Sequence, residues 1–260
     1  MDRRTFSKSI IGGALGGSVL CIHGCRRGSK APLGKKENTS NVKLAMMGGN
    51  TDAEYLTFVK QLGLDYVVVW TPKERATYEE LLALRQGIES SGIRVANIGN
   101  GSTHNQDRIT LGLPGRDDKI EEYKTFLRNA GRAGYHTSIY AHMANGIWST
   151  EQERCRGAVT RAFDLKEAKA GRATTRSYIP SMKENIRWSS IDSLTHSRVY
   201  SEQEIWDNWD YFIRQAAPVA EEAGIRIAIH PDDPPLPVLG GIPRIFSSFE
   251  GYKQALEIAN

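Results

Sequence analysis

Apolar and polar residues follow two different periods along the chain after residue 41. Short apolar runs, typical of buried parallel strands, occupy residues 42–47, 65–70, 93–98, 135–141 and 225–230. Between them lie stretches in which apolar residues recur every three or four positions, as on one face of a helix. These helical stretches cover residues 52–62, 77–91, 117–133 and 201–223, and a fifth begins at Ser247. The pattern predicts five successive βα units.

Repeated βα units predict a parallel sheet covered by helices. Three of the predicted helices end at a glycine that a strand follows almost at once, namely Gly63, Gly92 and Gly224. The connections after the strands are longer, as in a barrel whose active site lies at the carboxyl ends of its strands. A doubly wound sheet is the alternative, but no GxGxxG motif follows any strand.

We therefore predict an α/β fold, a partial (β/α)8 TIM barrel with about five βα units, over residues 41–260. A closed barrel of this type needs eight strands. The last predicted helix reaches Asn260 without a stop signal. We expect the sequence to be a fragment, truncated relative to its fold.

The first 40 residues have another character and predict a targeting segment. Arg3 and Arg4 are followed by Phe6 and Lys8, and then by a glycine-rich apolar run over residues 10–22. This order resembles a twin-arginine export signal. We interpret residues 1–25 as the signal peptide and residues 26–40 as a flexible linker. The alternative is a chance basic and apolar N-terminus, which would leave the protein in the cytoplasm.

Cys25 raises a further expectation for this segment. It follows Ile22, His23 and Gly24, an order that resembles a lipoprotein processing site. The protein would then be periplasmic or anchored to a membrane through a lipid on Cys25. The three cysteines of the chain are too few for a disulfide framework.

Composition and charge exclude one class of partner. The 260 residues are 40% hydrophobic and 25% charged, as in ordinary globular proteins. The net charge is +4, and its excess lies mainly in the first 36 residues. No basic stripe with interleaved aromatic residues follows, so nucleic-acid binding has no support. The sequence leaves the oligomeric state open.

The strongest candidate for chemistry is the segment HPDDPP at residues 230–235, directly after the fifth predicted strand. Pro231 keeps His230 out of helical conformation. A rigid imidazole at the carboxyl end of a strand is suited to bind a metal ion. Asp232 and Asp233 would bind substrate hydroxyls or orient the histidine. The alternative is a proline-rich turn with solvated carboxylates and a packed histidine.

The same segment carries a family resemblance. Residues 228–235, AIHPDDPP, followed by GIPRI at residues 241–245, resemble the signature of mannonate dehydratases. The helix that begins RDDKIEEYK at residues 116–124 is similar to a second pattern of that family. The resemblance runs from about residue 42 to the end of the chain and is strong in these two places.

The resemblance implies a xylose-isomerase-like (β/α)8 barrel that binds one divalent ion, Mn²⁺ or Fe²⁺. It implies the dehydration of D-mannonate to 2-keto-3-deoxy-D-gluconate in hexuronate (glucuronate) breakdown, which is lyase chemistry. His230 corresponds to one metal ligand, and the family's other ligands belong to later strands, beyond Asn260. The loop at residues 147–150, IWST, departs from the family's Asp-Trp-Thr-Arg.

Other polar residues are candidates for parts of such a site. His104 and His142 lie in predicted loops and are candidates for acid–base catalysis, or else surface residues. Arg244 would bind the carboxylate of a sugar acid or form a structural ion pair. Trp148 and Asn97 are candidates for substrate binding. The insertion at residues 148–200 is either a functional lid or partly disordered.

Three functions are consistent with these observations. The first is mannonate dehydratase activity, whole or residual. The second is another sugar isomerase or epimerase on the same barrel. The third is an exported binding protein without catalytic activity. Metal content would separate the third from the others, and the identity of the product would separate the first two.

Overall fold

The computed structural model describes residues 42–48, 51–175, 178–179, 181, 184–185 and 190–259. The predicted signal peptide, Cys25 and the linker at residues 26–40 lie outside the described residues. Among the helices that are described, none is both long enough and apolar enough to cross a bilayer.

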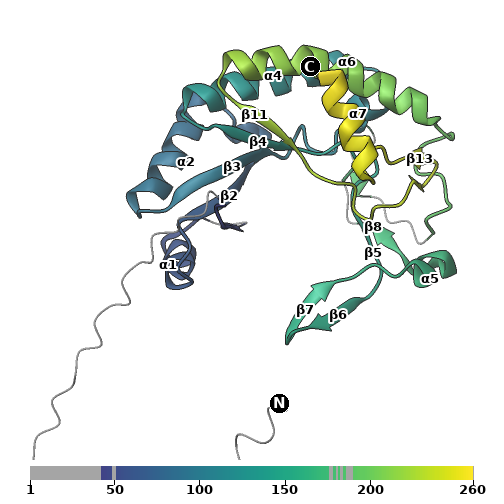
Figure 1. Ribbon diagram of the computed structural model, residues 1–260, viewed down its shortest axis with the longest axis horizontal. Helices are drawn as coiled ribbons and strands as arrows, with labels where there is room; N and C mark the ends of the chain where they lie inside the picture. Colours follow the sequence, from purple (N-terminus) through teal and green to yellow (C-terminus); the bar gives the residue numbers. More distant parts are fainter. Residues whose placement is uncertain are drawn as a thin grey trace, which may run out of the picture. The chain divides into compact units, whose positions relative to one another are not determined.

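Five parallel strands and their helices alternate along the chain (Figure 1). The strands are β1 (Ala45–Met47), β2 (Tyr66–Thr71), β3 (Arg94–Asn100), β4 (Thr137–Tyr140) and β11 (Arg226–Ile229). The helices are α1 (Ala53–Gln61), α2 (Tyr78–Ser90), α3 (Asp107–Leu111), α4 (Arg116–Arg132), α6 (Glu202–Glu222) and α7 (Phe249–Ala259), with a 3₁₀ turn, η1, at Lys73–Arg75.

The sheet has the order β1-β2-β3-β4-β11, which is the order of the strands along the chain. All four neighbouring pairs are parallel. A doubly wound sheet would reverse its order at a switch point, whereas a (β/α)8 barrel adds each strand beside the previous one. The prediction of a partial TIM barrel with five βα units is therefore confirmed.

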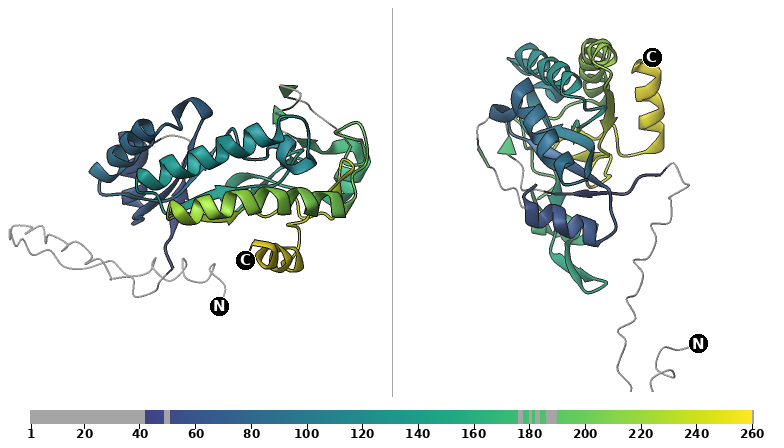
Figure 2. Two further views of the ribbon diagram at one scale, coloured as in Figure 1. Left: turned by 90° about the horizontal axis from the view of Figure 1, so that it is seen from above. Right: turned by 90° about the vertical axis from the view of Figure 1, so that its left-hand side faces the viewer.

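The helices α2, α4 and α6 cover one side of this sheet (Figures 1 and 2). The core lies between these two layers, where Val67 and Val69 of β2 pack with Leu81 and Ile88 of α2 in one buried cluster. These alternate positions of β2 face the helices because successive side chains of a strand point to opposite faces. Trp70 therefore points to the other side of the sheet.

Local signals explain where the helices begin and end. Asp52 caps α1 by accepting a hydrogen bond from the backbone N–H of Tyr55 at 2.8 Å. Ser201 and Glu204 form a capping box at the start of α6. Gly224 follows α6 with a φ of 67°, a left-handed conformation that glycine adopts without strain. These short turns set the positions of the strands that follow.

The insertion between β4 and α6 contains short antiparallel pairs, which the hydrophobic pattern did not predict. The pairs are β5 (Trp148–Ser149) with β8 (Thr174–Thr175), β6 (Gln152–Cys155) with β7 (Ala158–Arg161), and β9 (Tyr178–Ile179) with β10 (Glu184–Asn185). A helical turn α5 (Leu165–Glu167) and a π-helical turn η2 (Ala168–Arg172) lie between β7 and β8, and β12 (Val238–Leu239) pairs with β13 (Ile242–Pro243) after β11.

Candidate active site

Two histidines and a tryptophan meet beyond the carboxyl ends of the strands. His104 follows β3, and its ring lies edge-on to Trp70 at the end of β2, with the ring centroids 4.5 Å apart. The ring of His230, which follows β11, is nearly perpendicular to that of His104 at 6.1 Å. The carboxyl ends of three strands, β2, β3 and β11, thus contribute to one place. The structure brings together two of the predicted site residues, His104 and His230.

Glycine is required under Trp70. A Cβ atom built on Gly99 of β3 would lie 2.5 Å from the indole ring. Any larger residue at this position would displace Trp70 and, through it, the ring of His104. Gly99 was not among the predicted site residues, because its role depends on the register between β2 and β3, in which it pairs with Trp70.

The ring of His230 has a defined tautomer. Its Nδ1 lies 2.6 Å from the backbone oxygen of Pro231. Because a carbonyl oxygen only accepts hydrogen bonds, Nδ1 carries a proton, and in the neutral ring Nε2 then keeps its lone pair. Metal-binding histidines commonly donate their second N–H to a carbonyl oxygen in this way. The backbone N–H of His230 donates to Tyr140 at 2.8 Å, which continues the pairing of β11 with β4.

His104 has a different environment. Burial, reinforced by the electrostatic effect of the neighbouring His230, lowers the pKa of His104 to about 4. Its Nδ1 is buried without a hydrogen-bond partner among the described residues. A buried polar atom without a partner is unfavourable, so it marks a place where a ligand group fits.

Asp232 and Arg244 bind each other within the protein. Both side chains are almost fully buried, and Nη1 of Arg244 donates to Oδ1 of Asp232 at 3.3 Å. Asp232 Oδ2 also accepts the backbone N–H of Phe246 at 2.7 Å. Burial raises the pKa of Asp232, although the charge of Arg244 acts in the opposite direction. The structure thus shows the ion pair that the sequence analysis gave as one of two roles for Arg244.

Asp233 lies in a more open position. Its carboxylate pairs with Arg161 at the end of β7, and these side chains are 30% and 45% exposed, respectively. The backbone N–H of Trp148 donates to the carbonyl oxygen of Asp233 at 3.3 Å. Arg161 was not among the predicted site residues, because no local pattern connects an arginine of an insertion with a loop 72 residues later.

Trp148 and Asn97 occupy buried or partly buried positions. The indole of Trp148 is fully buried with Ile191 and Leu239, and its Nε1 donates to Asn145 at 3.2 Å. Asn97 belongs to β3, and its Oδ1 is buried without a hydrogen-bond partner in the described part of the chain. Of these two predicted substrate contacts, only Asn97 offers a polar atom that lacks a partner.

His142 follows the carboxyl end of β4, but its side chain is buried among aromatic rings. Its ring contacts Trp209, Phe212 and Phe246, and its Nδ1 lies 2.8 Å from the hydroxyl of Tyr140. Burial lowers its pKa to about 3. Its Nε2 is buried and, like Nδ1 of His104, has no hydrogen-bond partner among the described residues. His104 is the more exposed of the two predicted histidines.

The buried His142 makes stability depend on pH. In the unfolded chain its pKa returns to the ordinary value of 6.5, whereas the folded value is about 3. The unfolded state therefore takes up a proton as the pH falls below 6.5, and the folded state does not. This contribution to stability is complete above pH 6.5 and decreases toward pH 3, by up to about 1.4 kcal/mol per pH unit.

We expect His142→Asn to lose this pH dependence, because asparagine does not titrate. Urea denaturation at several pH values between 7.5 and 4.5 gives the free energy of unfolding of each protein. We expect this free energy to fall more steeply with decreasing pH in the wild type than in the variant. If the free energy of unfolding depends on pH equally in the two proteins, the lowered pKa of His142 is contradicted, whatever their difference in absolute stability.

The described residues provide part of a metal site. His230 Nε2 and the unpartnered His104 Nδ1 belong to neighbouring imidazoles. No three His, Cys, Asp or Glu side chains in the described ranges converge, however. A catalytic divalent-metal site commonly uses three protein ligands. These residues alone therefore do not complete a metal centre.

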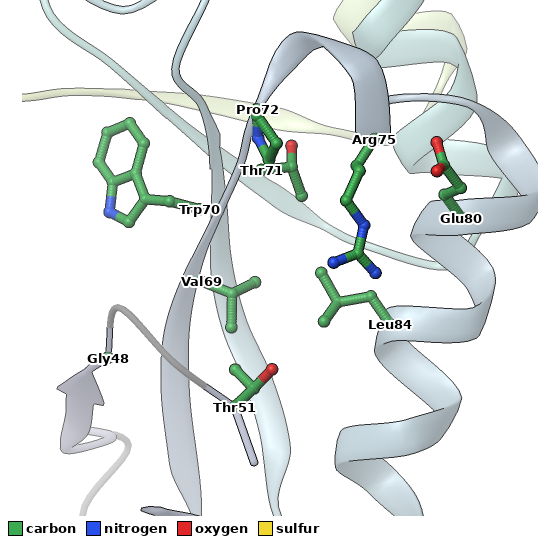
Figure 3. Close-up of a pocket in the computed structure, with 9 residues that line it drawn as sticks. All are labelled: Gly48, Thr51, Val69, Trp70, Thr71, Pro72, Arg75, Glu80 and Leu84. Atoms are coloured by element: carbon green, nitrogen blue, oxygen red, sulfur yellow. The ribbon is translucent and has the colours of Figure 1, made fainter.

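A cavity of about 220 Å³ lies at the carboxyl end of β2 (Figure 3). Val69, Arg75 and Leu84 extend toward it, whereas the Trp70 side chain lies on the other side of the strand. The cavity thus belongs to the layer between β2 and α2. The histidine pair lies with Trp70 on the opposite side of the sheet.

Comparison with known proteins agrees with this geometry. The family model described as D-mannonate dehydratase (UxuA) matches residues 41–260. A mannonate dehydratase of Streptococcus pneumoniae (strain 70585) is 33% identical over 187 residues, which cover 69% of this chain and 50% of the relative. A mannonate dehydratase of Shouchella clausii is 29% identical, covering 82% of this chain and 63% of the relative.

A solved structure gives the same result. The crystal structure of mannonate dehydratase from Streptococcus suis serotype 2 is similar with a TM-score of 0.63 and 29% identity, over 84% of this chain and 60% of that one. The chain spans about half to three fifths of the length of the proteins it matches. Because the family match covers nearly the whole described barrel, the chain belongs to the D-mannonate dehydratase family.

Proposed function

We propose that this chain carries part of the active site of a hydro-lyase that dehydrates D-mannonate to 2-keto-3-deoxy-D-gluconate. In this reaction the C2 proton is removed and the C3 hydroxyl leaves as water, and the resulting enol becomes the 2-keto acid. The observation that supports the proposal is the His230 imidazole, which stands at the end of β11 with Nδ1 bound to Pro231 and Nε2 available. It lies within the segment that matches the family.

His230 would contribute one ligand to a divalent ion, Mn²⁺ or Fe²⁺. Such an ion supplies positive charge that stabilises an enolate beside a carboxylate. His104 and Asn97 would contact substrate hydroxyls, because each has a buried polar atom without a partner among the described residues. Asp233 and Arg161 form an accessible pair in the neighbouring loop, where the guanidinium would bind the carboxylate of the sugar acid. No observation on the described residues favours the second candidate function, that of another sugar isomerase or epimerase.

Metal binding tests this proposal directly. We expect the full chain to bind Mn²⁺ weakly in calorimetric titration, because the described residues provide part of a metal site, and we expect His230→Gln to weaken that binding at least tenfold. His136→Gln is the matched control, because His136 is exposed and precedes β4 at the opposite end of the sheet. Equal Mn²⁺ affinity of the two variants, or no binding by the wild type, would contradict the proposal.

Product analysis then separates the remaining functions. Incubation of the Mn²⁺-loaded chain with D-mannonate is expected to yield the 2-keto-3-deoxy acid, which an assay for 2-keto-3-deoxy sugar acids detects. An isomerised or epimerised sugar would favour the second function, and a chain that binds no metal would favour the third, a binding protein without catalytic activity.

We also propose that the N-terminal segment directs export, with lipid attachment at Cys25. The support is the order of Arg3, Arg4, Phe6 and Lys8 before an apolar run. Cell fractionation tests it, and full-length protein confined to the cytosol would be inconsistent with export.

A further inference from the structure

Six polar side chains form a continuous buried chain around the strand ends. None is more than 5% exposed, and they come from four separate segments. We call this set the rim clamp: Asp107, Asn145, Thr195, His196, Asp232 and Arg244. Asp107 begins α3, Asn145 follows β4, Thr195 and His196 end the insertion, and the last two residues follow β11. Buried polar side chains are unfavourable unless each finds partners, so the contacts of this set are informative.

Arg244 connects the loop after β11 with the loop after β4. Its Nη1 donates to Asp232, and its Nη2 donates to Asn145 Oδ1 and to the carbonyl oxygen of Gly146, both at 2.7 Å. The guanidinium therefore already binds three groups of the protein. Its two terminal nitrogens are thus held by the protein, whereas its Nε is buried without a hydrogen-bond partner among the described residues.

Asn145 and Thr195 extend the chain into the insertion. Asn145 Nδ2 donates to Thr195 Oγ1 at 3.1 Å and to the carbonyl oxygen of Leu239 at 2.8 Å. The backbone N–H of Thr195 donates to Gly240 at 3.1 Å. A Cβ atom at Gly240 would lie 2.5 Å from the Thr195 methyl group, and the φ of Gly240 is 60°. The close approach of the insertion to the loop after β11 therefore requires a glycine there.

His196 and Asp107 complete the chain at the far end. Thr195 Oγ1 lies 3.2 Å from His196 Nδ1, and His196 Nε2 lies 3.3 Å from Asp107 Oδ2. Asp107 Oδ1 also accepts the backbone N–H of Ser181 at 3.1 Å. The carboxylate at the start of α3 thus binds two places of the insertion.

We propose that the rim clamp fixes the end of the insertion as a rigid wall of the site and sets the position of the loop that carries His230. Arg244, Asn145 and Thr195 are positioning residues, and none of them binds substrate. Loss of the Thr195 hydroxyl removes one hydrogen-bond partner each from Asn145, His196 and Gly240, so the connected segments loosen together. The consequence for His230 rests on the proposed function, whereas the coupling of the segments does not.

Hydrogen exchange of the full chain, followed by mass spectrometry, tests the coupling. Thr195→Val removes the hydroxyl and nearly keeps the shape. We expect it to raise exchange at least tenfold in residues 144–147 and 232–246 as well as in 190–200. Thr150→Val is the matched control, because its hydroxyl lies in the same insertion and, among the described residues, forms its hydrogen bonds with Ala162 and Asp164. The control is expected to affect residues 150–164 alone.

Faster exchange confined to residues 190–200, or none at all, would overturn the proposal. If Thr195→Val does not fold, Thr195→Ser gives the decisive comparison, because it keeps the hydroxyl: wild-type exchange supports the clamp, and faster exchange in all three segments contradicts it. Mn²⁺ titration adds the consequence for His230, with affinity at least threefold weaker in Thr195→Val. A wild-type chain that does not bind Mn²⁺ would refute the proposed function and leave the exchange pattern to decide the clamp.

Discussion

Gly131→Ala is expected to destabilise the protein by about 2 kcal/mol or more, whereas Gly87→Ala is expected to stabilise it. Both glycines lie inside helices, Gly131 in α4 and Gly87 in α2. Alanine favours a helix over glycine by about 1 kcal/mol. Replacing either glycine by alanine therefore brings the same gain in helix propensity. Any difference between the two variants comes from the atoms that surround each position.

The surroundings of Gly131 leave no room for a methyl group. A Cβ atom there would lie 2.2 Å from the carbonyl oxygen of Ala223, at the end of α6. This oxygen belongs to the backbone, so it moves only if the two helices separate. Around Gly87, no atom lies within 4 Å of the added carbon. The close packing of α4 and α6 thus depends on one glycine.

Urea denaturation of the full chain at pH 7 measures both changes. We expect Gly131→Ala to unfold at a lower urea concentration than wild type, and Gly87→Ala to unfold at the same or a higher urea concentration. The dependence of the free energy of unfolding on urea concentration is expected to be unchanged in both. Equal stability of the two variants would show that α4 and α6 do not approach each other as closely as described.

The elements that the sequence predicted are those whose signal is local. The strand and helix pattern of the five βα units depends on neighbouring residues, and the structure has each unit in place. Helix α3 was missed because four of its five residues are buried, Asp107 and Thr110 among them, so no amphipathic period exists. The strand β1 begins at Ala45, later than predicted, because its pairing with β2 begins there.

The site was predictable to the same extent. The position of His230 followed from the end of a strand and the proline after it, which are local features. The partners of Arg244 were not predictable, because Asn145 is 99 residues away. Nothing in the sequence favoured a structural ion pair of Arg244 over binding of a substrate carboxylate. The burial of Trp148 likewise depends on Ile191 and Leu239, which pack against it from segments distant in the sequence. Short-range patterns thus identify the loops, and only the fold determines their contacts.

The second large effect is expected from Arg244→Met. The substitution roughly keeps the length of the side chain and removes its charge. It leaves the carboxylate of Asp232 buried, with only 2% of its side chain exposed and its cationic partner lost. Breaking a buried ion pair from one side typically costs about 3–5 kcal/mol. We expect a loss of stability of this size in urea denaturation at pH 7.

Arg161→Met is the matched control, because Arg161 pairs with the very next residue, Asp233. That pair is partly exposed, so its loss is expected to cost less than about 1 kcal/mol. The double variant Asp232→Asn with Arg244→Met is expected to be less damaging than the sum of its single changes, because neither partner is then left charged. Equal losses for Arg161→Met and Arg244→Met, or simple additivity in the double variant, would show that Arg244 and Asp232 do not depend on each other. The fold would then hold the loop after β11 by packing alone, since the charge of Arg244 would be dispensable.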